Sequence, residues 1–312
     1  MPRIRIIANP ASRRGAGAKM IPVIQEKLKS QQLDFDLVRT ERPWHAADLA
    51  FQAAQEDVQV IAAAGGDGTA NEVLNGLMRA RQNGGSRPTM AVLPIGRGND
   101  FSFSMGAAAA LDASILSLAQ GYSRVIDLGF VKGGDYPQGR YFGNGVGIGF
   151  DAITGFEALK IPLVTGFVSY LLAAIRTIFI MKAPLVEIQL DNERIVQHCL
   201  LVSIMNGRRL GGGFWSAPQG ISDDGLFDLC IAREVSKLQM MMLIPRFLNG
   251  TQAGNPAIHM TRSHMVTVKA LKGTLAAHAD GETLCTGCQQ FDLEILPRQL
   301  DLIVQKNGSI HG

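Results

Sequence analysis

Residues 58–76 read VQVIAAAGGDGTANEVLNG, an apolar run that passes into three closely spaced glycines and then into a helical pattern. The run before the glycines has the length and composition of a buried strand. Glycines just past such a strand let the backbone approach a ligand closely, and the N–H groups that open the next helix attract anions. This stretch therefore predicts a strand, a glycine loop and a helix that together bind the phosphates of a nucleotide.

The same stretch differs from two familiar phosphate loops. It has no Gly-Lys-Ser/Thr ending, and Asn71 stands where the dinucleotide-binding fingerprint has its last glycine. Thr69 and Glu72 have the spacing of a capping box, which predicts that this pair opens the helix. The alternative interpretation is an ordinary tight turn before a capped helix.

The surrounding sequence alternates between strand and helix patterns. Strands that alternate with helices of crossover length form a parallel sheet with both faces covered, and ligands collect at the carboxyl ends of such strands. The predicted strands are 3–8, 35–40, 58–64 and 89–95, and the predicted helices are 20–33, 45–55 and the segment after Gly68.

A second glycine loop ends the strand predicted at 89–95. Residues 94–101 read PIGRGNDF, so Arg97, Asn99 and Asp100 fall at the sheet edge that also carries Asp67. A cation, an amide and carboxylates together suit a phosphate with its magnesium ion. The alternative for Asp100 is the N-cap of a helix.

The pattern changes after residue 127. Glycine and polar turns separate β-rich runs, which predicts a mostly antiparallel second domain after the α/β first one. We expect an N-terminal domain at 1–128, which residues 297–312 could rejoin, and a C-terminal domain at 129–296. The β-rich runs are 129–151, 185–205, 225–233, 264–270 and 291–296.

Composition and charge narrow the function classes. The 312 residues suffice for two domains, and 30 Lys and Arg against 27 Asp and Glu leave a net charge of +3. So small an excess argues against a nucleic-acid groove. The short apolar run at the start predicts no export. Cys285 and Cys288 have no second pair beside them, so we expect thiols rather than a zinc or redox site.

Several apolar or glycine-rich stretches predict buried or lipid-facing elements. Segment 161–181 contains Arg176 and predicts a buried or membrane-facing helix rather than a span. The run 240–248 predicts a core helix, with a lipid-facing surface as the alternative. Phe214-Trp215 predicts a membrane-facing loop, and the alternating glycines of 145–149 predict a strand packed closely against a neighbour.

The paired glycine loops carry a family resemblance that extends along nearly the whole chain. Gly-Gly-Asp-Gly-Thr-x-Asn-Glu, followed by Pro-x-Gly-x-Gly-Asn-Asp-Phe, resembles the catalytic domain of diacylglycerol kinases, in particular the soluble bacterial lipid kinases related to sphingosine and ceramide kinases. Further stretches match in the family's order. These are Asn9-Pro10-x-Ser12, Gly149-Phe150-Asp151-Ala152, Asn206-Gly207 to Gly213, Asp223-Asp224-Gly225-Leu226 and His278-Ala-Asp280-Gly281-Glu282.

The resemblance implies ATP bound between a Rossmann-like N-terminal domain and the β-rich one. It places a magnesium ion on Asp224 and on the carbonyls of Ile221 and Leu226, and a proton acceptor on Glu282. Arg97 stands where the family has threonine, although an arginine could hold a phosphate by charge-assisted hydrogen bonds. The implied nucleotide-binding residues are Asn9, Thr40, Gly65, Gly66, Asp67, Gly68, Thr69, Ala70, Asn71 and Arg97.

These residue types suit phosphoryl transfer to a lipid alcohol. A carboxylate within hydrogen-bond reach of the hydroxyl can accept its proton as the bond to the γ-phosphorus forms, and Glu282 or Asp280 could do this. Asp280-Gly281 could instead be only a hairpin turn.

We therefore expect an ATP- and Mg²⁺-dependent lipid kinase, cytoplasmic and peripheral to the membrane, acting on a lipid at the membrane surface and binding no nucleic acid. The sequence leaves a homodimer open. The rivals are an NAD kinase-like or phosphofructokinase-like phosphotransferase, which use similar glycine loops, and a non-catalytic nucleotide or lipid sensor, which the departure at Arg97 would favour.

Overall fold

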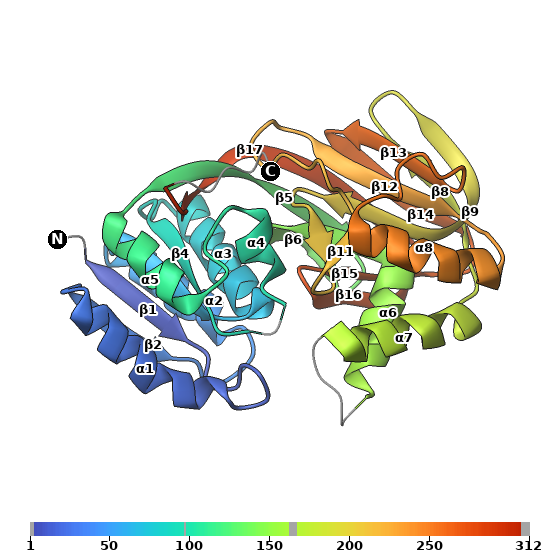
Figure 1. Ribbon diagram of the computed structural model, residues 1–312. Helices are drawn as coiled ribbons and strands as arrows, with labels where there is room; N and C mark the ends of the chain where they lie inside the picture. Colours follow the sequence, from blue (N-terminus) through green and yellow to red (C-terminus); the bar gives the residue numbers. More distant parts are fainter. Residues whose placement is uncertain (1–2, 97, 162–166, 307–312) are drawn as a thin grey trace. The chain divides into compact units, whose positions relative to one another are not determined.

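The computed structural model describes residues 3–96, 98–161 and 167–306. The chain forms two compact units (Figure 1). Unit 1 comprises Met1–Ile126 and Arg298–Gly312, and unit 2 comprises Asp127–Pro297.

Unit 1 is an α/β domain built on a parallel sheet in the order β4-β3-β1-β2. Its core joins Ile6, Ile24 and Leu93, which come from strands and from the apolar stripe of a covering helix. The strands are β1 (Ile4–Ala8), β2 (Phe35–Arg39), β3 (Val60–Gly65) and β4 (Thr89–Pro94), and the helices are α1 (Gly17–Ser30), α2 (His45–Gln55), α3 (Asp67–Gln82), α4 (Asp100–Ser104) and α5 (Leu111–Gln120).

The end of the chain completes this sheet. Strand β17 (Gln290–Ile303) reaches β4, where Leu302 pairs with Met90 in parallel. Ile303 joins the core of unit 1, and the Arg87 guanidinium forms a 2.8 Å ion pair with Asp301.

Unit 2 is mostly antiparallel. Strand β9 (Arg194–Met205) pairs through its first half with β8 (Leu185–Gln189), and through its second half with β7 (Gly145–Gly149) and β12 (Phe227–Arg233). The other strands are β5 (Ser123–Gly133), which begins in unit 1, and β6 (Tyr136–Phe142), β10 (Arg209–Leu210), β11 (Phe214–Trp215), β13 (Ile258–Ser263), β14 (Met265–Lys272), β15 (Leu275–Ala279) and β16 (Glu282–Cys288).

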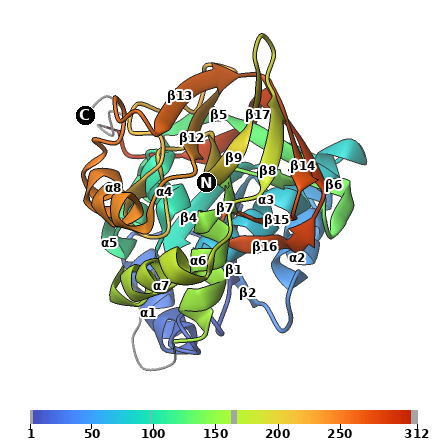
Figure 2. The ribbon, with the colours of Figure 1, turned by 90° about the vertical axis from the view of Figure 1, so that its right-hand side faces the viewer.

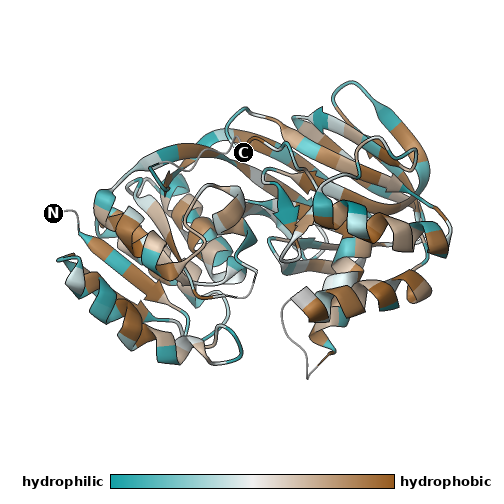
Figure 3. Cartoon of the chain, viewed as in Figure 1, coloured by the Kyte–Doolittle hydropathy of each residue, from teal (hydrophilic) through white to brown (hydrophobic). Residues whose placement is uncertain are grey.

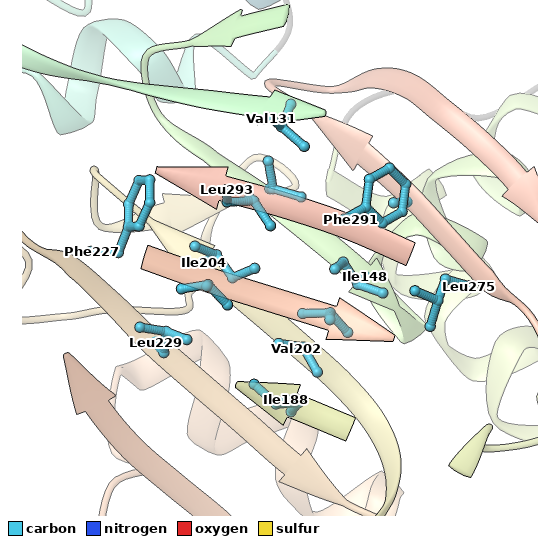
Figure 4. Packing of buried hydrophobic residues seen from close by; sticks show 14 of the residues in the cluster. Val131, Ile148, Ile188, Val202, Ile204, Phe227, Leu229, Leu275, Phe291 and Leu293 are labelled. Atoms are coloured by element: carbon cyan, nitrogen blue, oxygen red, sulfur yellow. The ribbon is translucent and has the colours of Figure 1, made fainter. Parts of the chain in front are cut away.

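The core of unit 2 lies between its strands. Ile148, Ile204, Phe227 and Leu293 are among the side chains that interdigitate there (Figure 4). Three helices complete the unit, and α6 and α7 lie side by side (Figure 2). They are α6 (Phe150–Leu159), α7 (Phe167–Ile180) and α8 (Lys237–Asn249).

The observed architecture confirms the predicted fold class, an α/β domain with a parallel sheet and a mostly antiparallel β domain. The predicted helix at 45–55 has the bounds of α2. The sequence did not reveal β13, β15 or β16, because their short runs mix polar and small residues without a clear alternation. None of the helices in the described ranges is long and apolar enough to span a membrane.

Candidate functional site

Four loops of unit 1 meet at the carboxyl ends of its parallel strands. The backbone N–H of Asn9, after β1, donates to the Ala64 carbonyl over 2.9 Å, and that of Thr40, after β2, donates to the Ala8 carbonyl over 2.9 Å. Ile95, after β4, donates to the Gly65 carbonyl over 2.9 Å. The structure thus gathers at one sheet edge the predicted nucleotide-binding residues of unit 1. Arg97 lies outside the described residues.

The loops after β3 and β4 approach so closely that only glycine fits between them. A Cβ on Gly96 would lie 2.4 Å from the Gly66 Cα, and a Cβ on Gly65 would lie 2.3 Å from the Thr69 Oγ1. Both distances are far below an ordinary van der Waals contact. The glycines therefore let the start of α3 come close to the neighbouring loop.

The Asp67 carboxylate ties these two loops together. Its Oδ1 accepts a 2.9 Å hydrogen bond from the Phe101 N–H in the first turn of α4. Its Oδ2 lies 3.1 Å from the position that a Cβ on Gly98 would take. Asp67 therefore has a local structural role whether or not a ligand is bound, and Asp100, buried in the same turn, lies beside it.

Asn9 and Thr69 connect the first loop to α3. The Asn9 Nδ2 donates to the Thr69 Oγ1 over 3.0 Å, while the Asn9 Oδ1 accepts from the Ala11 N–H over 2.9 Å. The first N–H groups of α3 have no partners within the helix, and together with the helix dipole they favour an anion there. The geometry of this edge suits a phosphate group.

The predicted capping box is wrong. Helix α3 begins at Asp67, with Gly66 as N-cap and without a side-chain cap, so Thr69 already lies in its first turn. Glu72 reaches another helix instead, because its Oε2 accepts a 3.1 Å hydrogen bond from the Ala46 N–H at the start of α2. The spacing was right for a cap, but the N-cap lies three residues earlier, at Gly66.

In unit 2, Asp280 is a buried structural carboxylate. Its oxygens accept hydrogen bonds from three successive N–H groups, those of Gly143 at 2.8 Å, Asn144 at 2.9 Å and Gly145 at 3.0 Å. Asp280 and Gly281 also form the two-residue turn between β15 and β16, since Ala279 before them pairs with Glu282 after them. Both turn residues have a positive φ. The hairpin alternative therefore describes this pair correctly.

Glu282 has a different setting from Asp280. It is the first residue of β16 and its side chain is exposed. An exposed carboxylate next to a rigid turn can accept a proton from an approaching hydroxyl, whereas the oxygens of Asp280 are already occupied by backbone donors.

A buried cluster lies beside this turn and joins Asp151 and His278, from two stretches that carry the family resemblance, to Tyr170, which the sequence did not indicate. The Asp151 Oδ2 and the His278 Nε2 are 2.9 Å apart, and the Tyr170 hydroxyl donates to the Asp151 Oδ1. Burial alone would raise the pKa of Asp151, but electrostatic attraction to His278 and hydrogen bonds from His278 and Tyr170 outweigh it, so this pKa is lowered. His278 is 127 residues from Asp151, and no spacing rule connects them.

The alternating glycines of β7 make room for this cluster, as the sequence predicts for a strand that packs closely against its neighbour. A Cβ on Gly147 would lie 2.3 Å from the Asp151 Oδ2 and 2.7 Å from the His278 Nε2. The Asp151 carboxylate and the His278 imidazole therefore occupy the space that a side chain at Gly147 would need.

Asp151 also lies at the wall of an apolar cavity in unit 2. Nearly all of its other lining side chains are apolar, and they come from α6, α7, α8, β9, β11 and β12. Phe214, which the sequence placed in a membrane-facing loop, lies in β11, is half-buried and packs on Tyr170 with ring centroids 5.2 Å apart. The remaining lining residues are Phe150, Leu200, Leu201, Ser216, Ala232, Met240, Leu243, Ile244 and Phe247.

The turn predicted to hold magnesium is engaged with an arginine. The Arg262 guanidinium pairs with Asp224 and, at 3.0 Å, with Asp228. Burial raises the pKa of Asp228, as does the nearby Asp224 charge, while Arg262 opposes the shift. Within the described ranges no group of three or more His, Cys, Asp or Glu residues has metal-binding geometry.

The donor types at this turn nevertheless suit a hard cation. Asp224 offers a carboxylate, and Ile221 and Leu226 offer backbone carbonyls near it in sequence. The Asp228 Oδ2 is buried and accepts no hydrogen bond from the described residues. A cation would compete with Arg262 for Asp224.

Comparison with known families gives two adjoining matches. Residues 3–131 match the diacylglycerol kinase catalytic domain, and residues 144–304 match the YegS C-terminal NAD kinase beta sandwich-like domain.

Individual relatives agree with these matches. The chain is 29% identical to a diacylglycerol kinase of Bacillus subtilis over 90% of both chains, and 32% identical to a "probable lipid kinase YegS-like" protein of Citrobacter koseri over 80% of this chain and 79% of the other.

Solved structures share the fold. A diacylglycerol kinase structure from Bacillus anthracis aligns with a TM-score of 0.74 at 20% identity over 99% of this chain and 98% of the other. An NAD kinase from Archaeoglobus fulgidus in complex with ATP aligns with a TM-score of 0.52 at 13% identity over 98% and 95%.

We expect Gly147→Ala to lower the free energy of unfolding by about 1–3 kcal/mol, because the new methyl group would overlap the Asp151 carboxylate. Urea unfolding followed by circular dichroism measures this. Gly155→Ala is the matched control, because a Cβ there meets nothing within 4 Å and the residue lies in α6. Alanine should leave stability at that position unchanged or raise it. Equal stability of the two variants would contradict the packing described for β7.

Proposed function

This chain belongs to the diacylglycerol kinase family of lipid kinases, and we propose that it transfers the γ-phosphoryl group of ATP to the hydroxyl of a diacylglycerol-like lipid alcohol. In the reaction the lipid oxygen forms a bond to the γ-phosphorus, the bond between that phosphorus and the bridging oxygen of ADP breaks, and the hydroxyl proton passes to a base.

The apolar cavity of unit 2 is the observation that carries the lipid assignment. Its lining is hydrocarbon and aromatic except for Asp151, Tyr170 and Ser216. An acyl chain gains free energy on entering such a lining, roughly 0.8 kcal/mol for each methylene removed from water. A nucleotide acceptor such as NAD would instead require many polar partners.

The nucleotide is assigned to the sheet edge of unit 1. In this proposal the opening N–H groups of α3, in the segment Gly65–Asn71, hold phosphate oxygens. Asn9 and Asp67 keep the surrounding loops in place through the hydrogen bonds described above. Thr40 and Arg97 supply further nucleotide contacts.

Glu282 is proposed as the general base, with Asp280 as the residue that positions it. The exposed Glu282 carboxylate takes the proton from the lipid hydroxyl. Asp280 holds the turn that precedes Glu282 against the loop at 143–145.

Mg²⁺ is proposed to bind Asp224 together with the carbonyls of Ile221 and Leu226. A bound Mg²⁺ would supply positive charge and fixed oxygen coordination, and in this proposal it orders the turn rather than contacting the nucleotide. Arg262 neutralises the same carboxylate when the ion is absent.

The NAD kinase-like alternative has one supporting observation, the shared fold. An assay in which purified protein, labelled ATP and Mg²⁺ are supplied with a total lipid extract or with NAD separates the two. We expect label in a lipid product identified by mass spectrometry. Label in NAD alone would replace the lipid assignment, and nucleotide binding without transfer to either would indicate a sensor.

Glu282→Gln should lower kcat by about two to four powers of ten with little change in the KM for ATP, because the amide cannot accept the proton. Steady-state kinetics with a water-soluble short-chain diacylglycerol measure this. Glu294→Gln, an exposed glutamate of β17 in the same unit, is the control and should retain wild-type rates.

Asp280→Asn distinguishes the positioning residue from the base. Its main expected effect is a loss of about 1–3 kcal/mol in stability, since an amide cannot satisfy three converging N–H groups. A stable Asp280→Asn protein with greatly reduced kcat, beside a normal Glu282→Gln, would transfer the role of base to Asp280.

Magnesium should raise the melting temperature of the wild-type protein and should not raise that of Asp224→Asn. A ligand that binds only the folded state stabilises it by an amount that grows with the ratio of its concentration to its Kd, and the substitution removes the carboxylate ligand. Differential scanning fluorimetry with and without Mg²⁺ gives both shifts, and Asp223→Asn in the same turn is the control. Equal shifts in wild type and Asp224→Asn would remove Asp224 from the metal site.

A further inference from the structure

Helix α7 presents most of its bulky apolar side chains outward, and apart from the buried Ile178 its inward side chains are mostly small. Val168, Leu172, Ile175 and Phe179 are exposed and recur at intervals of four, three and four residues, which places them along one stripe of the helix. Figure 3 shows α7 as hydrophobic along most of its length. A helix that only packs on a protein core has the opposite pattern.

The inward face of α7 is already satisfied within unit 2. Ser169, Ala173, Ala174 and Thr177 are buried, and the two hydroxyl groups donate to backbone carbonyls, Thr177 to that of Ala173 at 2.9 Å. The exposed stripe is therefore not needed to hold the helix in the fold. Exposed apolar side chains at a regular helical spacing mark a surface that meets a partner.

Helix α8 adds to this surface. Leu238, Met241 and Met242 are exposed, whereas Met240 and Leu243 are buried toward the cavity. Helix α8 therefore has a buried side, as the core-helix interpretation predicts, and an exposed apolar side. The Lys237 ammonium lies 5.2 Å from the centroid of the Phe179 ring and so connects the two helices.

The charged residues within helices α7 and α8 are all basic. Helices α7 and α8 contain Arg176, Lys237 and Arg246 and no aspartate or glutamate. Exposed Lys160 and Lys182 flank α7, and the exposed Glu234 precedes α8. Glu157, which pairs with Lys160 at 2.6 Å and with Arg176 at 2.8 Å, is buried. Basic side chains around an apolar stripe complement the negative charge of anionic lipid headgroups.

We propose that the exposed faces of α7 and α8 dock unit 2 onto an anionic lipid bilayer. We name this the docking face and define it by Val168, Leu172, Ile175, Phe179, Leu238 and Met242. Docking would give the proposed lipid kinase access to its substrate, and the inference rests on that proposed function. The apolar side chains enter the level of the headgroups and upper acyl chains, while the basic side chains contact lipid phosphates.

The cavity supports the same partner. Tyr170 of α7 and Leu243, Ile244 and Phe247 of α8 line it from the sides of these helices that face the protein. The docking face and the cavity thus share two helices. Helix α7 has 14 residues, fewer than a span needs, so it lies on the surface.

Co-flotation of the purified full chain with vesicles tests the docking face. Wild type should bind vesicles of phosphatidylcholine with 30% phosphatidylglycerol, bind pure phosphatidylcholine less, and lose binding as salt rises. The double variant Leu172→Glu/Phe179→Glu should bind anionic vesicles at least 10-fold more weakly. Leu116→Glu is the control, because Leu116 of α5 is 49% exposed and Leu172 is 45% exposed.

The outcomes separate this inference from the proposed function. Unchanged vesicle binding in the double variant, or an equal loss in Leu116→Glu, would overturn the docking face. So would a wild-type dimer in sedimentation velocity that the double variant dissociates, since the face would then belong to a second copy. Retained phosphorylation of a water-soluble short-chain diacylglycerol by the double variant, with lost vesicle binding, supports it. Vesicle binding without any lipid phosphorylation by wild type would reject the proposed function alone.

Discussion

The absence of a side chain at Gly147 is the constraint on which the interior of unit 2 depends. Two buried polar groups, the carboxylate of Asp151 and the imidazole of His278, project into the space that a Cβ would occupy. A buried carboxylate is tolerable only when it is hydrogen-bonded, and these bonds exist because β7 can pass so close to α6 and β15. The same close packing fixes the loop at 143–145 against Asp280, and with it the start of β16.

Much of the fold could be predicted because the local hydrophobic pattern of a segment matches its burial in the folded chain. The apolar runs of β3 and β4 are buried on both faces, so their sequences show parallel central strands directly. The glycine loops could be found for the same reason, since each follows such a strand. The sheet edge that gathers Asn9, Thr40 and Gly65 is a consequence of parallel topology, which the strand and helix alternation already indicates.

What the sequence could not reveal depends on long-range pairing or on competition between local signals. The cluster of Asp151, Tyr170 and His278 joins three elements that have no spacing in common. The spacing of Thr69 and Glu72 is that of a cap, but α3 begins earlier, with Gly66 as N-cap, and Glu72 accepts a hydrogen bond at the start of α2 instead. The outward apolar stripe of α7 was ambiguous in sequence because composition alone does not say which face of a helix is covered.

Strand β17 has a consequence for the order of events during synthesis. Leu302 and Ile303 complete the sheet and core of unit 1, although the rest of that unit precedes residue 127. Unit 2 is in this sense an insertion in a domain that stays open at β4 until the last strand is made. During synthesis the edge of β4 therefore stays unpaired while the ribosome translates the 171 residues of unit 2, from Asp127 to Pro297. An unpaired strand edge is a template for wrong pairing, so correct folding of unit 1 depends on the prompt pairing of β17.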